Sequence, residues 1–289
     1  MSKPKILIQL DTDPHCSVFD AVVAVDAGVQ HLLSYSGVEP SGVRDLVHGA
    51  MFTRGPGDLH HTAVFIGGSD VTAGERLLAS VTAAFFGPLR VSVLLDSSGA
   101  NTTAAAAVLS AARHQALPGA LALVLAGTGP VGQRAARLLA GQGAVVRLAS
   151  RRLSRATEVC DRLAQQIPGA RWEPCETADA ASTARAVQGA AVVLAAGTAG
   201  VELLPEALLN ADGGLRVAVD LNAVPPAGIG GIEPQDRAVT RNGVVTYGAL
   251  GVGTDKMRIH RAAVRRLFTR NDAVLDAEEI FQIGREVLS

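Results

Sequence analysis

The chain has 289 residues, a formal net charge of −1 and an aromatic content of 3%. It is long enough for one large domain or two ordinary ones, and its near-neutral charge and few aromatic side chains argue against a nucleic-acid surface, which needs a basic face and platforms for base stacking. Three cysteines, Cys16, Cys160 and Cys175, are too few and too scattered for a disulfide framework or a zinc site. We therefore expect a cytoplasmic protein with small-molecule partners.

The first third of the chain alternates short apolar runs with helical patterns. The runs at 5–10, 63–66 and 91–95 predict strands, and the first is too short for a signal peptide or a membrane span. Each strand precedes an expected helix, from Ser17 to Leu33, from Thr72 to Phe86 and from Thr102 to Gln115. This alternation indicates a parallel sheet covered on both faces.

Several side chains follow the carboxyl ends of these strands, where ligands bind in such sheets. They are Asp11, Asp13, Phe19, Asp70, Asp96, Thr102 and Thr103. For any single aspartate, ordinary capping or turn chemistry is the simpler account.

The strongest motif begins after a break at 117–119. The apolar strand 121–126 is followed by Gly127-Thr-Gly-Pro-Val-Gly132 and then by a helical pattern at 133–140. In G-x-G-x-x-G, the first glycine permits a tight turn, the second lets the backbone approach a pyrophosphate, and the third lets helix pack on strand. The sequence therefore predicts a dinucleotide site formed by Gly127, Thr128, Gly129, Pro130, Val131 and Gly132.

The next strand, 144–150, indicates which dinucleotide is bound. An NAD enzyme places an acidic residue about twenty residues past the glycines, whereas this chain has Ser150, Arg151 and Arg152. Two guanidiniums and a hydroxyl suit a 2′-phosphate, so NADP is expected, with NAD as a secondary cofactor. The alternative is that the arginines only solvate a strand end.

Further strands at 170–174, 191–195, 215–220 and 244–247 complete a six-stranded doubly wound sheet. The tips after two of them, with Ala196, Gly197 and Asn222, should face the nicotinamide half of the cofactor. The glycine-rich segment 227–231 reads equally as a flexible loop or as a linker.

The last third places a lysine and a histidine on one helix face. Lys256 and His260 are four residues apart in a helix expected from Thr254 to Phe268. Lysine occurs only at positions 3, 5 and 256, and the first turn of a helix is unfavourable for a cation, which favours a neutral amine there. A solvated lysine is the competing account. A terminal helix follows Asp276 and should pack on the first domain.

These elements predict a two-domain α/β protein. Residues 1–116 with 250–289 would form a parallel-sheet domain, and 117–249 a Rossmann-like NADP-binding domain. His60-His61 has no third ligand at useful spacing, and G-x-S-x-G does not occur, so neither a metal site nor acyl transfer is expected.

Seven stretches, spread over nearly the whole chain, together form a recognisable pattern. They are Asp11-Thr-Asp-Pro through Asp20, Tyr35 onward to Gly55, Phe65-Ile-Gly-Gly-Ser-Asp70 with Ala73-Gly-Glu-Arg76, Phe85-Phe-Gly-Pro88, Asp96-Ser-Ser-Gly-Ala-Asn-Thr-Thr103, Ala126 to Gly132, and Pro225-Pro-Ala-Gly-Ile-Gly-Gly231. In these stretches the chain closely resembles the bacterial NADP-dependent methylene-tetrahydromethanopterin dehydrogenases.

The resemblance implies a two-domain relative of the methylene-tetrahydrofolate dehydrogenases. It implies a homotrimer whose active sites lie between domains and are completed by a neighbour. It also implies that Phe19, one or both of Thr102 and Thr103, Lys256 and His260 are functional. This chain differs at Thr254-Asp255, where the best-known members are more apolar, and at Ser150 to Arg152.

The expected reaction is reversible oxidation of methylene-tetrahydromethanopterin, or its dephospho form, to the methenyl cation by direct hydride transfer. One alternative is a methylene-tetrahydrofolate dehydrogenase, although Tyr35 and Tyr247 lack the lysine four residues on that the bifunctional folate enzymes carry. The other is a non-catalytic NADP sensor.

Overall fold

The computed structural model describes residues 3–209 and 213–289. The chain forms two compact units: a discontinuous unit, residues 1–102 with 257–289, and a central unit, residues 103–256. Both boundaries fall inside helices, α4 (Ala100–Ala112) and α8 (Ala249–Arg266). They therefore differ from the expected boundaries at 116/117 and 249/250, because a continuous helix runs through each one.

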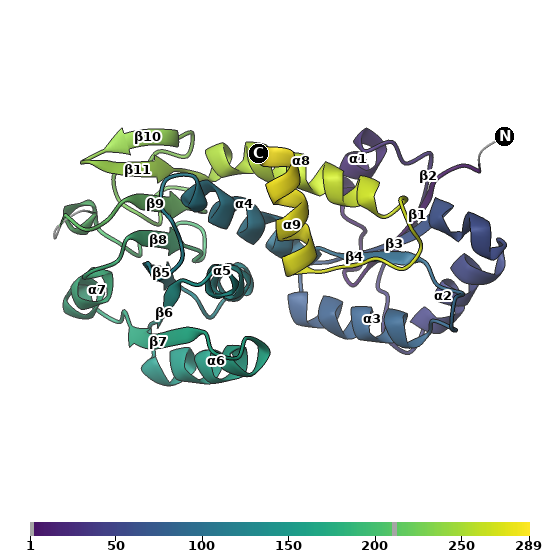
Figure 1. Cartoon of the computed structure of the whole chain (residues 1–289), viewed down its shortest axis with the longest axis horizontal. Helices are drawn as coiled ribbons and strands as arrows, with labels where there is room; N and C mark the ends of the chain where they lie inside the picture. The colour runs from purple at the N-terminus through teal and green to yellow at the C-terminus, as the bar shows by residue number, and fades with distance from the viewer. Residues whose placement is uncertain (1–2, 210–212) are drawn as a thin grey trace. The chain divides into compact units, whose positions relative to one another are not determined.

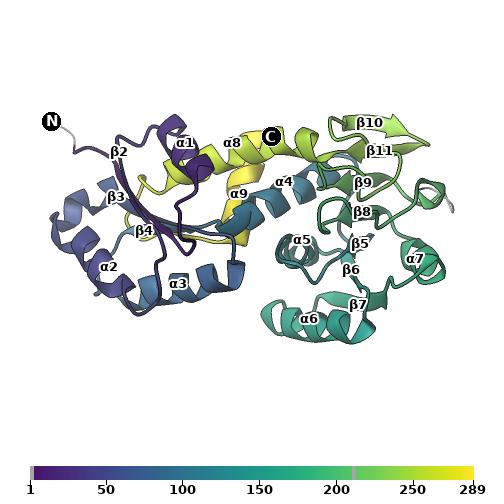
Figure 2. The same cartoon turned by 180° about the vertical axis from the view of Figure 1, so that it is seen from behind.

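The discontinuous unit contains a five-stranded sheet in which every pair is parallel. Its order is β12-β4-β3-β1-β2, so the winding direction reverses between β1 and β3. The strands are β1 (Ile6–Asp11), β2 (His31–Tyr35), β3 (Thr62–Gly67), β4 (Ser92–Leu95) and β12 (Val274–Leu275). In both views, α2 (Val43–Phe52) and α3 (Val71–Ala83) lie on one side of this sheet, and α1 (Val18–Asp26) and α8 on the other (Figures 1 and 2).

Helices cover both faces because successive side chains of each strand point to opposite faces of the sheet. Val64 and Ile66 of β3 pack in one apolar cluster with residues of α2 and α3. Phe65, between them, points to the opposite face, where its ring stacks on that of His260 from α8. The strand is buried along its whole length, as expected for a parallel sheet covered on both sides.

Several elements of this unit differ from the prediction, among them the short strand β12, which was not expected. The first helix stops at Asp26, because Gly28 adopts a left-handed φ of 90°, and the residues expected to continue it form edge strand β2. Helix α2 was not predicted at all. Its signal is weak because Gly42 provides no side-chain cap, although Val43, Val47, Ala50 and Met51 have helical spacing and are buried.

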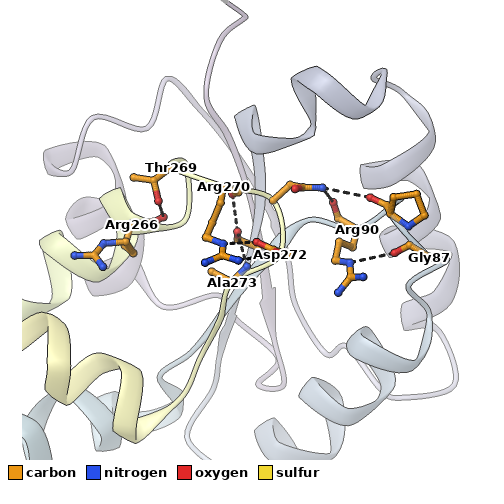
Figure 3. A network of polar contacts seen from close by, with 10 residues as sticks. Gly87, Arg90, Arg266, Thr269, Arg270, Asp272 and Ala273 are labelled. Atoms are coloured by element: carbon orange, nitrogen blue, oxygen red, sulfur yellow. Dashed lines mark hydrogen bonds and ion pairs between the residues drawn. The ribbon is translucent and has the colours of Figure 1, made fainter.

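The C-terminal segment returns to this sheet through a polar turn (Figure 3). Asn271 donates from Nδ2 to the carbonyl of Arg90 at 3.0 Å, and Arg270 pairs with Asp272. Ser92 Oγ donates to the carbonyl of Arg270 and accepts from the backbone N–H of Ala273. These bonds align β12 beside β4, and α9 (Ala277–Leu288) then completes the unit, so the prediction that the terminal helix joins the first domain is confirmed.

The central unit contains a seven-stranded sheet ordered β10-β11-β9-β8-β5-β6-β7. Six of its strands are parallel, in the order of a doubly wound dinucleotide-binding sheet. They are β5 (Leu121–Leu125), β6 (Val145–Ser150), β7 (Arg171–Glu176), β8 (Val192–Ala195), β9 (Val217–Asp220) and β11 (Val244–Tyr247). Helices α5 (Pro130–Gly141) and α6 (Leu153–Gln166) lie on one side and α7 (Ala180–Val187) on the other (Figures 1 and 2).

The seventh strand, β10 (Arg237–Arg241), was not predicted. It pairs antiparallel with β11 and is almost wholly exposed, so it lacks an apolar pattern. Its signal was the Asn242-Gly243 pair, whose φ values of 49° and 77° fit a two-residue hairpin turn. Within residues 3–209 and 213–289, no helix combines the length and apolarity needed to cross a membrane.

Candidate dinucleotide and substrate sites

The glycine turn after β5 contains two positions without room for a side chain. A Cβ on Gly127 would lie 2.7 Å from Leu148 Cγ and 2.9 Å from the carbonyl oxygen of Val124. A Cβ on Gly132 would lie 2.8 Å from the Cα of Gly127. These two glycines are therefore required for close packing of strand, turn and helix.

Gly129, at the N-cap of α5, differs from these two glycines because a side chain would fit there. A Cβ there would meet only the carbonyl oxygens of Ala126 at 3.5 Å and Ala196 at 3.8 Å, and its φ of −77° suits any residue. The fold itself therefore does not require glycine at this position. Thr128 and Val131 are half-buried and Pro130 is exposed. The backbone around Gly129 is thus accessible to an anion at the helix N-terminus.

The end of β6 lies beside this turn, because the N–H of Gly127 donates to the carbonyl of Ala149. Ser150 is half-buried, and its Oγ accepts from the N–H of Arg152 at 3.4 Å. Arg151 and Arg152 are exposed, and neither side chain forms an ion pair with any residue that the structure describes. Both guanidiniums can therefore bind an external anion.

The tips after β8 and β9 are tightly packed. Gly197 has no room for a Cβ, which would lie 2.7 Å from Leu203 Cδ1. The side chain of Asn222 serves its own loop, donating to the carbonyl of Pro226 at 2.8 Å and accepting from the N–H of Val224 at 2.9 Å. Ala196 donates its N–H to the carbonyl of Leu125, which connects β8 to β5.

Asp220, at the end of β9, organises the segment that the sequence left as either loop or linker. Its carboxylate accepts from the N–H groups of Asn222 and Ile229, at 3.0 and 3.1 Å. Burial raises the pKa of Asp220, although these backbone hydrogen bonds act in the opposite direction. The carbonyl of Gly228 also accepts from Leu203 and Leu204. Residues 227–231 are therefore a packed part of the central unit.

In the discontinuous unit, the aspartates at strand ends are bonded to the protein. Asp11 is buried and accepts from the N–H groups of Asp13 and Ser17. Asp13 accepts from both the N–H and the hydroxyl of Ser69, and Asp70 caps α3. Asp11 and Asp70 thus make the bonds of turns and caps, as the simpler account predicted, whereas Asp13 joins the segments that follow β1 and β3.

The structure distinguishes the two adjacent threonines. Thr102 is fully buried, and its Oγ1 donates to Asp96 Oδ2 at 2.6 Å. Asp96 Oδ1 also accepts from the N–H of Thr102 at 3.0 Å. Thr103 is half-buried. Of the pair, Thr103 is therefore the one that we expect to reach a ligand, and Thr102 holds the start of α4.

Phe19 and His260 come together although they are far apart in sequence. Their ring centroids are 6.4 Å apart, and the His260 ring stacks on Phe65 at 5.8 Å with an interplanar angle of 22°. Phe19 is 52% exposed, whereas His260 is 1% exposed. A ligand can therefore contact Phe19 directly, while His260 lies behind it. Phe65 and the neighbouring Asp20 were missed, because only strand register and tertiary packing bring them to His260.

Helix α8 starts earlier than predicted. A Cβ on Gly248 or Gly251 would lie 2.0 Å from the carbonyl oxygens of Glu233 or Asp236, so these glycines pack directly on turn 233–236. The helix begins at Ala249, which places half-buried Lys256 beyond its first two turns. The argument for a neutral Lys256 in a first helical turn was therefore wrong.

Two carboxylates fix this part of the central unit. Asp236, itself buried, accepts two hydrogen bonds from Arg241, at 2.6 and 2.7 Å, and one from Thr246 at 2.8 Å. Buried Asp255, next to Lys256, pairs with Arg113 at 2.6 Å and Arg237 at 3.0 Å. Asp255 thus lies at the centre of a small ion-pair network. Among the described residues, no group of three or more His, Cys, Asp or Glu could hold a metal ion.

Comparisons with known proteins decide the family. A family model described as the N-terminal part of methylene-tetrahydromethanopterin dehydrogenase matches residues 18–98. The NAD(P)-dependent methylenetetrahydromethanopterin dehydrogenase of Methylorubrum extorquens is 30% identical, covering 98% of this chain and 98% of the relative. The chain belongs to the methylene-tetrahydromethanopterin dehydrogenase family. Bifunctional protein MdtA of the same organism is 46% identical, covering 99% of this chain and all of the relative.

Solved structures support the α/β fold of this dehydrogenase family member. Shikimate 5-dehydrogenase of Listeria monocytogenes, in complex with shikimate and NAD, matches with a TM-score of 0.53 and 16% identity, covering 99% of this chain and 96% of that one. The 5-ketofructose reductase of a Gluconobacter strain has a TM-score of 0.51 and 18% identity, covering 99% of each chain. The predicted fold class and family are both confirmed.

Proposed function

We propose that this chain is an NADP-dependent dehydrogenase that reversibly oxidises the methylene bridge of tetrahydromethanopterin, or of its dephospho form, to the methenyl cation. The structural observation that best supports NADP binding is that Gly129, at a helix N-terminus, is a glycine that the fold itself does not require. The substrate class comes from the name of the full-length relative that is 30% identical.

The residues of the central unit fit the nucleotide. The turn Gly127 to Gly132 would hold the pyrophosphate on the N-terminus of α5, and Arg151 with Arg152 would hold the 2′-phosphate. The tips at Ala196, Gly197 and Asn222 would shape the nicotinamide side. When bound, NADP supplies a hydride acceptor at C4 of its nicotinamide.

The reaction removes a hydride and no proton, since the resonance-stabilised cation forms directly. The protein therefore mainly has to align the donor carbon, an effect worth several kcal/mol. Phe19 would position the pterin, His260 would support it, and Thr103 and Lys256 would supply polar contacts.

Replacing Arg151 and Arg152 together with alanine should raise the KM for NADP about 100-fold, because two charge-assisted hydrogen bonds are lost. The KM for NAD should change little, since NAD has no 2′-phosphate. Steady-state kinetics with both cofactors measure this. Arg155→Ala, which removes an exposed arginine of α6 paired with Glu158, is the matched control. An equal rise in KM for NADP and NAD would show that Arg151 and Arg152 do not bind the 2′-phosphate.

The decisive test of the function compares four substrate pairs. The purified chain is assayed with methylene-tetrahydromethanopterin and methylene-tetrahydrofolate, each with NADP and NAD, by following reduced cofactor at 340 nm. We expect the highest kcat/KM for the methanopterin carrier with NADP. A clear preference for the folate carrier would make the chain a methylene-tetrahydrofolate dehydrogenase. NADP binding without turnover of either carrier would instead support a sensor.

We also propose a homotrimer located in the cytoplasm. The family resemblance supports the trimer, and the unpaired state of all three cysteines is compatible with a reducing compartment. Light scattering coupled to gel filtration should give three times the 29.7 kDa chain mass. A monomer at assay concentrations would contradict the trimer, and recovery outside the cytoplasmic fraction would contradict the location.

A further inference from the structure

A carboxylate lies next to the buried imidazole of His260. Asp20 Oδ1 is 4.0 Å from His260 Nε2, and the two side chains are 13% and 1% exposed. Asp20 lies in the first turn of α1, directly after Phe19. One short segment therefore places both an aromatic ring and a carboxylate near His260. At 4.0 Å these two atoms are too far apart for a hydrogen bond but close enough for electrostatic attraction.

The segment that carries Asp20 is held in place by hydrogen bonds to strand β1. Ser17 caps α1 by accepting from the N–H of Asp20 at 3.2 Å. Ser17 itself donates its N–H to Asp11 at 3.0 Å, and its carbonyl accepts from Gln9 Nε2 at 3.2 Å. Both Gln9 and Asp11 are buried residues of β1. The position of Asp20 is therefore fixed by the sheet, and a carboxylate in the first turn of a helix is electrostatically favourable.

A fixed carboxylate near Nε2 favours the form of the ring that carries a proton on that nitrogen. In a neutral ring with its proton on Nε2, Nδ1 is then the nitrogen that can accept a hydrogen bond. Of the elements that meet the ring, β3 supplies uncharged Phe65, α1 supplies Asp20, and α8 itself carries Lys256 one turn earlier. Asp20 is thus a charged group that can distinguish the two ring nitrogens.

We propose that Asp20 is a positioning residue that acts through His260, by fixing the protonated nitrogen and the orientation of its imidazole. The proposal rests on the proposed function, in which His260 supports the pterin. Removal of Asp20 then leaves His260 in place between the phenylalanines, but with its two nitrogens no longer distinguished.

The first test needs no substrate. With ¹⁵N-labelled histidine in the full chain, His260 is assigned by comparison with His260→Gln, and its nitrogen shifts report which nitrogen carries the proton. We expect a proton on Nε2 in the wild type and a clear change of both shifts in Asp20→Asn. Asp26→Asn makes the same change at the exposed end of α1 and should leave His260 unchanged. Identical His260 shifts in Asp20→Asn and the wild type would overturn the proposal.

The second test is kinetic and uses whichever carrier the wild type oxidises. Asp20→Asn should lower kcat about tenfold, within the range of couplings inside one polar network, with no change in the KM for NADP. Asp20→Glu should recover part of the loss. Altered His260 shifts with unchanged kcat would also overturn the positioning role. If the wild type oxidises no carrier, the proposed function fails, while the nuclear magnetic resonance result still reports on Asp20 and His260.

Discussion

Substituting alanine at Gly129 is expected to weaken NADP binding about 100-fold without reducing the stability of the protein, whereas alanine at Gly132 should lower both. The Cβ added at Gly129 fits the fold, with no neighbour closer than 3.5 Å, but it occupies the space that a pyrophosphate needs. The Cβ added at Gly132 meets backbone, at 2.8 Å from the Cα of Gly127 and 2.9 Å from the carbonyl oxygen of Ala126. Backbone cannot yield as a flexible side chain does, so we expect a cost of about 3 kcal/mol.

Two measurements separate these effects. Thermal unfolding without ligand gives the change in Tm, and calorimetric titration gives the Kd for NADP. Gly141→Ala, at the other end of α5, is the control, since a Cβ there has no neighbour within 4 Å. It should preserve the Kd for NADP and leave Tm unchanged or slightly higher, since alanine favours a helix more than glycine does. Wild-type affinity in Gly129→Ala would show that no phosphate approaches this backbone.

Asp236→Ala should lower the free energy of unfolding by about 2 to 3 kcal/mol, because it removes a buried carboxylate that accepts hydrogen bonds from Thr246, the backbone of Glu233 and the partly exposed Arg241. Burial alone would raise the pKa of Asp236, but hydrogen bonds from Arg241, Thr246 and the backbone of Glu233 outweigh it and lower the pKa. Because the folded-state pKa lies below the unfolded value, the ionised form contributes its full stabilisation at pH values above the ordinary aspartate pKa of about 3.9. This contribution is lost as the pH falls through the folded pKa.

Urea unfolding of both proteins at pH 7 and at successively lower pH tests this sign. The difference between wild type and Asp236→Ala should be largest near neutrality and should shrink in acid. Asp161→Ala removes an exposed carboxylate of α6 in the same unit and should match the wild type. A difference that grows in acid would contradict the lowered pKa of Asp236.

Local patterns were enough for the buried central strands and the glycine-rich turn after β5. Buried parallel strands such as β3 and β5 appear as continuous apolar runs, and the glycines of the turn follow β5 directly. Edge strand β10 lacks such a run because its side chains face solvent, and the start of α8 depends on the distant turn that Gly248 and Gly251 approach. A local window contains neither kind of information.

The sequence suggests candidate site residues but not the contacts that they make. The adjacent threonines look alike in sequence, and only the bond from Thr102 to Asp96 separates their surroundings. The pairing of Asp20 with His260 joins residues that 239 intervening positions separate, and it depends on α1 and α8 sharing one face of the sheet. Packing supplies that proximity, and no spacing rule encodes it.

The discontinuous unit has a consequence for how the protein is made. Its sheet needs β12, and its covering layer needs the end of α8, yet both lie in residues 257–289. A ribosome makes the central unit, 103–256, before those residues appear. Domains commonly fold during synthesis as their residues emerge. The central unit can therefore reach its native state first, while residues 3–102 still have part of their apolar surface uncovered.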